Sequence, residues 1–243
     1  MASPVLSLPR PFGSAAGDLE IDYGSADRPA QVTALLAACD PGADAAAWWR
    51  RPVGERIAAL LALEQRTTGR DAITLTLRCG RAGCGARYEI ELPYAALPTS
   101  TDAPTVAIER EDGATVVLRR PTGDDLRAWH LQPPASHAEM LARLAVDGQA
   151  DAGAALRSAE ALAAADPLLD FGVACVCPEC GESTEREVDL EGIALQRLAA
   201  RQHAVLREVH ALASRYGWTE AEIFAVAAPR RARYLDLIEG GDA

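Results

Sequence analysis

Apolar residues in the first third of the chain recur every three or four positions, which is the period of an amphipathic helix. The pattern predicts a helix over 29–39, a second beginning near Asp44 and a third over 52–69, which starts at a proline and ends at a glycine. Residues 1–29 are rich in Pro, Gly, Ser and Asp and show no period, which is typical of an extended or disordered arm. We therefore expect an arm followed by N-terminal helices over 30–70.

The hydrophobic period then changes to two over 71–97, where two alternating strands flank a pair of cysteines. The same order returns over 170–190, as an apolar strand, a cysteine pair, a glycine and an acidic strand ending in leucine. Because the two segments match each other, they predict two halves of one small unit that the intervening residues split.

The intervening residues, 104–169, carry their own pattern. Alternation over 106–110 and 115–120, joined by an Asp-Gly turn, predicts a β-hairpin. One helix should follow Pro121, a second should begin at the capping box Ser136-His-Ala-Glu, and a third should cover about 154–164. We expect an inserted hairpin followed by helices.

The C-terminal segment, 191–239, has a helical period throughout. A long amphipathic helix starts near Gly192 and ends before Gly217. The capping box Thr219-Glu-Ala-Glu opens a short helix, and Pro229 opens the last one. These helices predict a C-terminal helical hairpin.

Four of the six cysteines form two pairs, each at the turn between two expected strands. Cys177 and Cys180 form a Cys-Pro-Glu-Cys-Gly turn, whereas four residues, two of them glycine, separate Cys79 from Cys84. Zn²⁺ prefers four tetrahedral ligands, and four thiolates leave no position open for catalysis. The pattern predicts a structural Zn²⁺ ion held by Cys79, Cys84, Cys177 and Cys180.

Two cysteines lie outside these pairs. Cys175 shares a strand face with Cys177 and is an alternative ligand, although it cannot form the tight turn. Cys39 lies at a helix end, where a small buried apolar residue is its expected role. The paired cysteines have two other interpretations. They are reduced thiols that bind no metal, or Cys177 and Cys180 have a redox role, which no Trp-Cys-x-x-Cys pattern supports. The longer spacing makes Cys79 a weaker ligand candidate than the other three.

Composition agrees with a mainly helical chain. About half of the 243 residues are apolar, and most of these are Ala, Leu and Val with few aromatic residues. The expected fold class is α+β, mainly helical, with a split four-cysteine zinc ribbon, an inserted β-hairpin and helical segment, and a C-terminal helical hairpin.

Charge and hydropathy exclude several classes of partner. The formal net charge is −11 and every basic residue is Arg, so nucleic acid is an unlikely main partner. No apolar run reaches the roughly 20 residues of a membrane helix, and the first residues lack the features of a signal peptide. We expect a cytoplasmic protein with no membrane partner, in which paired cysteines bind metal rather than form disulfides.

Candidate catalytic residues are few. His203 and His210 lie on one face of the long helix, but a pair of exposed histidines is commoner than a metal site. The chain contains no Ser-His-Asp signature, phosphate-binding glycine loop or dinucleotide fingerprint. We expect no enzymatic activity.

The order of several motifs resembles a known family. It runs from Arg-Pro-Val-Gly-Glu-Arg-Ile-Ala-Ala-Leu-Leu (51–61) and the first cysteine pair to Leu-Arg-Arg-Pro-Thr-Gly-Asp-Asp-Leu (118–126) and Cys-Pro-Glu-Cys-Gly. It ends in Glu-Val-His-Ala-Leu-Ala-Ser-Arg-Tyr-Gly-Trp-Thr-Glu-Ala-Glu-Ile-Phe (208–224) and Arg-Arg-Ala-Arg-Tyr-Leu-Asp-Leu-Ile. This series is similar to the baseplate-associated zinc-ribbon proteins of phage-like contractile injection systems and T-even-type contractile phage tails, a family of baseplate hub or assembly proteins.

The resemblance covers most of residues 45–239, leaving out the Ala-rich stretch near 145–165. The chain departs from the family in the long first cysteine turn and in Ala-Val-Ala-Ala at 225–228. The resemblance implies a structural or chaperone-like assembly protein that binds baseplate or other tail proteins, stays in the cytoplasm or joins the finished particle, and has no enzymatic role. The alternative is a zinc-ribbon module associated with nucleic acid or regulation.

Aromatic and arginine side chains, which are enriched at protein interfaces, concentrate near the C-terminus. Aromatic residues at helical spacing are more often core residues, so a place in the core is the favoured alternative for Trp218 and Tyr234, whereas the arginines are expected to be mostly exposed. The candidate partner-binding residues are Tyr216, Trp218, Arg230, Arg231, Arg233 and Tyr234.

Overall fold

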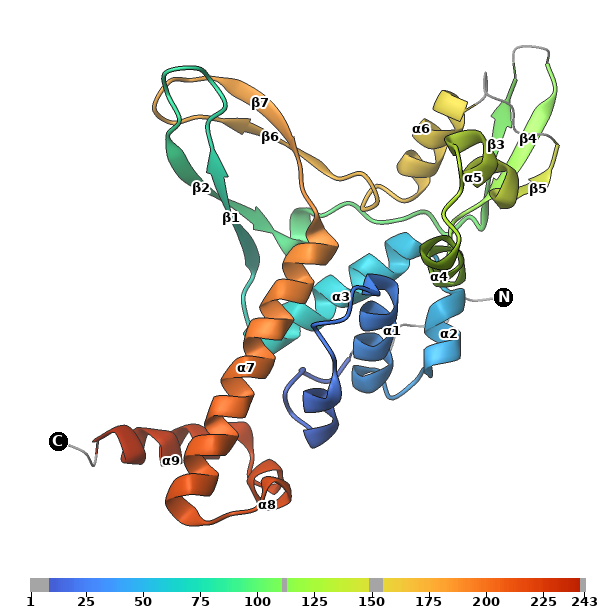
Figure 1. The fold of residues 1–243 in the computed structure, drawn as a ribbon. Helices are drawn as coiled ribbons and strands as arrows, with labels where there is room; N and C mark the ends of the chain where they lie inside the picture. The colour runs from blue at the N-terminus through green and yellow to red at the C-terminus, as the bar shows by residue number, and fades with distance from the viewer. Residues whose placement is uncertain (1–8, 111–112, 149–154, 241–243) are drawn as a thin grey trace.

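Three short helices and the first half of a long one form the centre of the molecule, from which three parts project (Figure 1). The computed structural model describes residues 9–110, 113–148 and 155–240. The central helices are α1 (Arg28–Cys39), α2 (Ala45–Arg50), α3 (Val53–Thr68) and α7 (Leu190–Tyr216). Their apolar faces meet in a core of buried aliphatic side chains that also holds Trp48.

Side-chain caps explain where these helices begin and end. Asp27, Asp44 and Asp189 each accept a hydrogen bond from the backbone N–H three residues later, which satisfies a donor that the first helical turn leaves free. Gly69 ends α3 with φ of 67°, a left-handed conformation that glycine adopts without a steric cost. The helices predicted over 30–70 therefore form where the sequence places them.

The expected arm over 1–29 is wrong for residues 9–29, and residues 1–8 lie outside the described range. Ala16–Glu20 forms the 3-10 helix η1, and Phe12 is buried in the main core. The Asp18 carboxylate is fully buried, and it accepts hydrogen bonds from the Arg10 guanidinium at 2.5 and 2.7 Å and from the Gly13 N–H at 2.7 Å. The buried ion pair and the phenyl ring order a segment whose Pro, Gly and Ser content suggests disorder.

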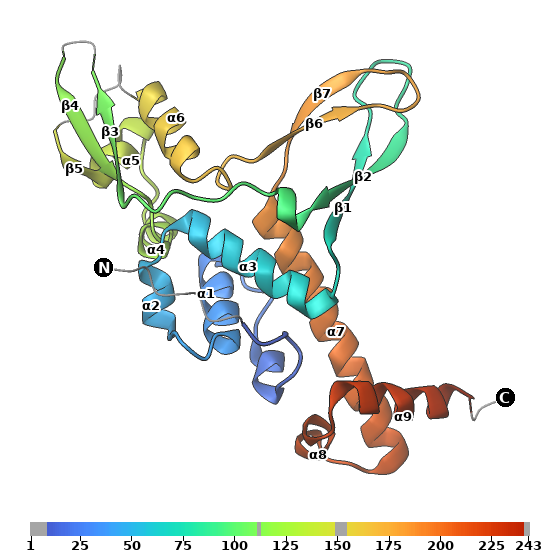
Figure 2. The same cartoon turned by 180° about the vertical axis from the view of Figure 1, so that it is seen from behind.

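The described strands form three small antiparallel sheets that do not pair with one another. Two of them are two-stranded: β1 (Ala72–Arg78) with β2 (Arg87–Pro93), and β6 (Gly172–Val176) with β7 (Ser183–Glu187). A short 3-10 helix, η2 (Tyr94–Ala96), follows β2. These four strands project together from the start of α7, and we call them the cysteine lobe (Figure 2).

The insertion lobe contains the third sheet, in the order β3-β4-β5, and the helices beside it. Its elements are β3 (Thr105–Glu109), β4 (Thr115–Arg119), α5 (His137–Leu144), β5 (Ala145–Asp147) and α6 (Ala155–Ala165). It has its own core, formed by Ile108, Val116, Leu118, Leu141, Leu144 and Leu162. Helix α4 (Gly123–Leu131) follows β4 and packs against α1 and α2 of the centre. The predicted hairpin and helices are present, although Asp112 of the predicted turn lies outside the described residues, and β5 was not expected.

A buried ion pair joins the insertion lobe to the centre. The Arg120 guanidinium, which is 3% exposed, donates to both Asp166 carboxylate oxygens at 2.6 and 2.8 Å and to Thr101 O at 2.8 Å. A Cβ atom on Gly54 of α3 would lie 2.4 Å from Asp166 Oδ1, so only glycine allows α3 to approach this pair.

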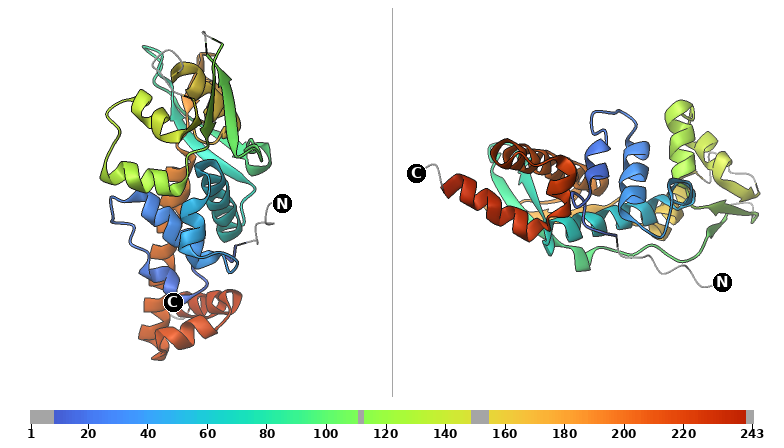
Figure 3. Two further views of the ribbon diagram at one scale, coloured as in Figure 1. Left: turned by 90° about the vertical axis from the view of Figure 1, so that its right-hand side faces the viewer. Right: turned by 90° about the horizontal axis from the view of Figure 1, so that it is seen from below.

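The C-terminal arm is the end of α7 together with α8 (Glu220–Ala225) and α9 (Ala228–Gly240), at the far end of α7 from the strands (Figure 3). Gly217 has φ of 70° and ends α7, and the Thr219 and Glu222 side chains form the expected capping box. α9 turns back and packs against α7. Taken together, these elements make the fold α+β and mainly helical.

Among the described residues, no helix has the length and apolarity that crossing a bilayer requires.

Candidate metal centre

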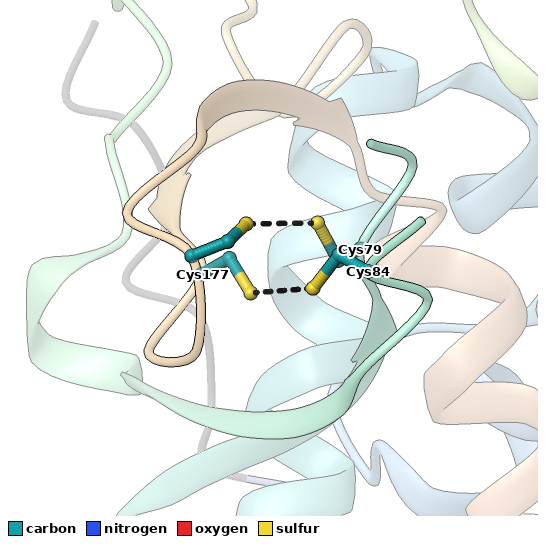
Figure 4. Close-up of side chains that lie close together, drawn as sticks. Cys79, Cys84 and Cys177 are labelled. Atoms are coloured by element: carbon teal, nitrogen blue, oxygen red, sulfur yellow. Dashed lines mark hydrogen bonds between the residues drawn. The ribbon is translucent and has the colours of Figure 1, made fainter. Parts of the chain in front are cut away.

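The turns of the two cysteine-lobe hairpins bring four thiols together. The sulfur atoms of Cys79, Cys84, Cys177 and Cys180 all lie within 4.8 Å of one another. Across the two turns, Cys79 Sγ is 3.7 Å from Cys180 Sγ, and Cys84 Sγ is 3.9 Å from Cys177 Sγ. Figure 4 shows the sulfurs of the first turn facing those of the second. The four cysteines predicted as ligands thus form one cluster, which includes Cys79.

The spacing of the sulfurs fits a tetrahedral metal ion. A zinc–sulfur bond of about 2.3 Å places tetrahedral thiolates about 3.8 Å apart. The observed cross-turn distances of 3.7 and 3.9 Å lie on either side of that value. Both are far longer than the roughly 2.05 Å of a disulfide bond, so the arrangement suits a metal rather than a covalent bridge.

Both turns close in the same way despite their different lengths. The Cys79 N–H donates to Ala86 O at 2.8 Å, and the Cys177 N–H donates to Glu182 O at 2.9 Å. In each case the acceptor lies two residues after the second cysteine. The residue between them is a glycine with positive φ, Gly85 or Gly181. The two extra residues of the first turn are accommodated without changing its closing hydrogen bond.

Backbone N–H groups point at the sulfurs from two residues further along the chain. A hydrogen bond from Glu182 N–H is the main reason that the pKa of Cys180 is lowered to about 7. A similar bond from Arg81 lowers the pKa of Cys79, but burial and hydrogen bonds with the other thiols outweigh it and raise the pKa to about 12. Such N–H groups stabilise thiolates, the form that binds metal, so metal binding releases the protons that the clustered thiols retain.

Arginine side chains connect the two hairpins around the cluster. Arg186 of β7 donates to Arg78 O of β1 at 3.3 Å, and Arg81 of the first turn donates to Cys180 O at 3.4 Å. Four thiolates around a divalent cation carry two net negative charges, which nearby guanidinium groups offset. Sequence reasoning missed these arginines, although Arg81 lies between the two ligands of the first turn.

The remaining cysteines lie outside the cluster. Cys175 is 3% exposed, and its thiol donates to Val173 O at 3.5 Å. Cys39 is fully buried at the end of α1, and burial raises the pKa of its thiol to about 12. The expectation of a small buried apolar residue fits Cys39, and Cys175 is not one of the four clustered cysteines.

Most of the predicted partner-binding residues gather on the C-terminal arm. The rings of Tyr216, Trp218 and Tyr234 lie within 5.0 to 5.6 Å of one another, and Arg230 donates to Tyr234 Oη at 3.1 Å. Tyr216 is 38% exposed. These four residues form one surface, which we call the aromatic surface.

The expectation fails for one of the arginines. Arg231 is only 3% exposed, because it turns inward to donate to Val226 O at 2.9 Å and to lie over the Phe224 ring. Arg230 and Arg233 are exposed, as expected. His203 and His210 are exposed on α7 and belong to no metal-ligating group within the described ranges.

Comparisons of the chain with protein-family models, with curated proteins and with solved structures find no match.

Proposed function

We propose that this chain is a non-enzymatic structural or assembly protein of a contractile, phage tail-like baseplate, and that it binds other tail proteins. The proposal comes from the motif order described above. The observation that supports it most is the position of the most specific motif, Val-His-x-Leu-Ala-x-x-Tyr-Gly-Trp at 209–218 with Arg-Arg-x-x-Tyr-Leu at 230–235. Its two parts lie at the end of α7 and on α9, and they contribute Tyr216, Trp218 and Tyr234 to the aromatic surface. A motif that lies on an exposed arm with interface-like composition favours a binding role.

The metal in this proposal is a structural Zn²⁺ ion in a split zinc ribbon. Four cysteine thiolates would complete its tetrahedral shell and leave no position for a substrate. Cys79 and Cys84 come from one hairpin and Cys177 and Cys180 from the other, so the ion would hold the two hairpins at a fixed angle. An adaptor protein needs its projecting parts held in this way.

Co-purification tests the proposed role. The tagged chain is expressed with its neighbouring gene cluster, and the proteins it retains are identified and its zinc measured. We expect sheath, spike or baseplate proteins, with one zinc per chain. Trp218→Ala should reduce their recovery several-fold, whereas Leu131→Ala, at the exposed end of α4, should not.

Absence of every tail protein from repeated purifications would contradict the baseplate role. The alternative, a nucleic-acid-associated or regulatory zinc ribbon, predicts salt-dependent binding to DNA or RNA instead. The net charge of −11 argues against it.

A further inference from the structure

One edge of β1 carries backbone groups that point away from β2. The Cys79 N–H bonds to Ala86 O, directly opposite it in the antiparallel register. Because ladder hydrogen bonds recur every second residue, they fall on the odd-numbered residues of β1. The N–H and C=O groups of Thr74, Thr76 and Arg78 therefore point to the outer edge.

Arginine side chains cover part of this outer edge. Arg197 of α7 donates to Thr74 O at 3.0 Å, and Arg186 of β7 donates to Arg78 O at 3.3 Å. Between these two bonds, the backbone groups of Thr76 have no protein partner in the part of the chain that the structure describes. Unpaired groups on an edge strand are a template for another strand.

A groove runs along the same edge. Two cavities of about 350 and 240 Å³ share Thr76 and Leu77 as lining residues. The larger one continues toward α7, where Leu75, Val188 and Ile193 give it an apolar part. The smaller one ends at Arg78 and Arg87, next to the first cysteine turn. At the α7 end of the groove, Glu187, Asp189 and Arg197 lie beside the apolar residues, whereas at the other end the charged lining residues are both arginines.

Two arginines lie side by side at the cationic end of the groove. Arg78 and Arg87 are direct cross-strand partners, an arrangement that like charges destabilise. Both side chains are exposed, and neither forms a salt bridge within the described residues. Glu89, the nearest carboxylate on β2, lies opposite Thr76 and accepts a hydrogen bond from its hydroxyl at 3.5 Å. A carboxylate supplied by a partner could therefore form a salt bridge with both arginines.

From this geometry we infer that the outer edge of β1 binds an extended, acidic segment of a partner protein as an added strand. The partner backbone pairs with the N–H and C=O groups of Thr76. An apolar side chain of the segment contacts Leu75 and Val188, and a carboxylate lies between Arg78 and Arg87. This surface is separate from the aromatic surface, and the inference holds whether or not the partner belongs to a phage-like tail.

The test uses the full-length, metal-loaded protein and two synthetic peptides. One peptide alternates Val and Thr over six residues and ends in two Glu residues, and the other ends in two Lys residues. In ¹⁵N-resolved NMR spectra, we expect the acidic peptide to shift the amide signals of Thr76 and Arg78 and to slow hydrogen exchange at Thr76. The basic peptide should bind at least about fivefold more weakly.

Two variants separate backbone pairing from charge. Thr76→Pro removes an N–H that points away from β2, so the β1–β2 ladder is retained and only the added strand loses its partner. Thr76→Val keeps that N–H and is the matched control. Arg87→Ala should remove the preference for the acidic peptide, whereas Arg70→Ala, an exposed arginine outside the groove, should leave it unchanged.

Three results with the peptides would overturn the inference. These are equal binding of the two peptides, peptide-induced shifts confined to residues outside the groove, and unchanged binding by the Thr76→Pro protein. Shifts at Thr76 that depend on protein concentration without peptide would assign the groove to a second copy of this chain, and would overturn it as well.

Discussion

Two adjacent arginines on α9 have opposite surroundings. Arg230 is exposed beside Tyr234, whereas Arg231 is buried, 3.9 Å from Glu208 of α7 and bonded to Val226 O. Their positions on the helix differ by about 100°. That rotation alone turns one guanidinium to solvent and the other into the contact between α9, α8 and α7.

Replacing each arginine with alanine should therefore give different results. Arg231→Ala should lower the free energy of unfolding by about 2 kcal/mol, because it leaves Val226 O without its donor and removes the packing on Phe224. Arg230→Ala should change it by less than about 0.5 kcal/mol. Urea denaturation monitored by circular dichroism measures both values. Equal losses would mean that Arg231 is not a structural contact.

At the scale of elements, a polar junction joins β4 to α4. The Asp125 carboxylate accepts hydrogen bonds from the Arg119 guanidinium at 2.5 and 2.6 Å and from the Thr122 N–H at 2.8 Å. Burial alone would raise the pKa of Asp125, but these bonds outweigh it and hold the pKa below its ordinary value. One carboxylate thus caps the helix and ties it to the preceding strand.

This junction should make stability depend on pH. Since the pKa of Asp125 is lower in the folded chain than in the unfolded chain, its contribution is complete above the ordinary value, near pH 4, and is lost as pH falls through the folded value. We expect Asp125→Asn to destabilise the protein by about 1 kcal/mol at pH 7 and by progressively less under acid conditions. Thermal melts of the two proteins at several pH values measure this difference. A difference that stays constant down to pH 2 would contradict the proposed role.

The sequence predicts well those helices and strands that have a long run of periodically spaced apolar residues or a clear cap. The Ser136 cap, the capping box at Thr219 and the αL glycine Gly217 mark helix ends from local chemistry alone. The strand β5 escapes prediction, because three residues cannot show an alternation and it forms only by pairing with β4. The segment 9–27 escapes because residues distant in sequence hold it: Phe12 packs in the main core, and Gln202 of α7 donates to Asp18 O at 3.0 Å.

The candidate metal centre can likewise be predicted from the sequence only in part. Each cysteine pair is a local feature, so its turn can be recognised from spacing and glycine content. The pairing of Cys79 with Cys180 and of Cys84 with Cys177 is not local, since it depends on how two separately formed hairpins face each other. For the same reason, the hydrogen bonds that arginine side chains form between the hairpins cannot be predicted from the sequence.

At the scale of the whole molecule, the cysteine cluster closes a long loop. Cys84 and Cys177 are 93 residues apart, and the loop between them contains the insertion lobe. A cross-link closing a loop of this length constrains the unfolded chain by about 4 to 5 kcal/mol. A metal bound here would therefore stabilise parts of the protein far from the cluster.

Loss of the metal should therefore affect the entire fold. We expect Cys177→Ser to abolish stoichiometric zinc and to lower the melting temperature by about 10 to 20 °C. Cys175→Ala should retain one zinc per chain, because Cys175 lies outside the cluster. Elemental analysis and calorimetry test both proteins. Full zinc content in the Cys177→Ser protein, or its loss in the Cys175→Ala protein, would contradict the assignment of ligands.

The long stretch of sequence between the two cysteine pairs also affects metal binding during protein synthesis. During synthesis, Cys79 and Cys84 leave the ribosome long before Cys177 and Cys180, and until then they offer an ion only half of its ligands. A chain that stops within the insertion lobe would hold metal weakly, whereas one that continues past Cys180 would hold it with all four thiolates. Tight metal retention would thus mark the chains whose synthesis has reached the last ligand.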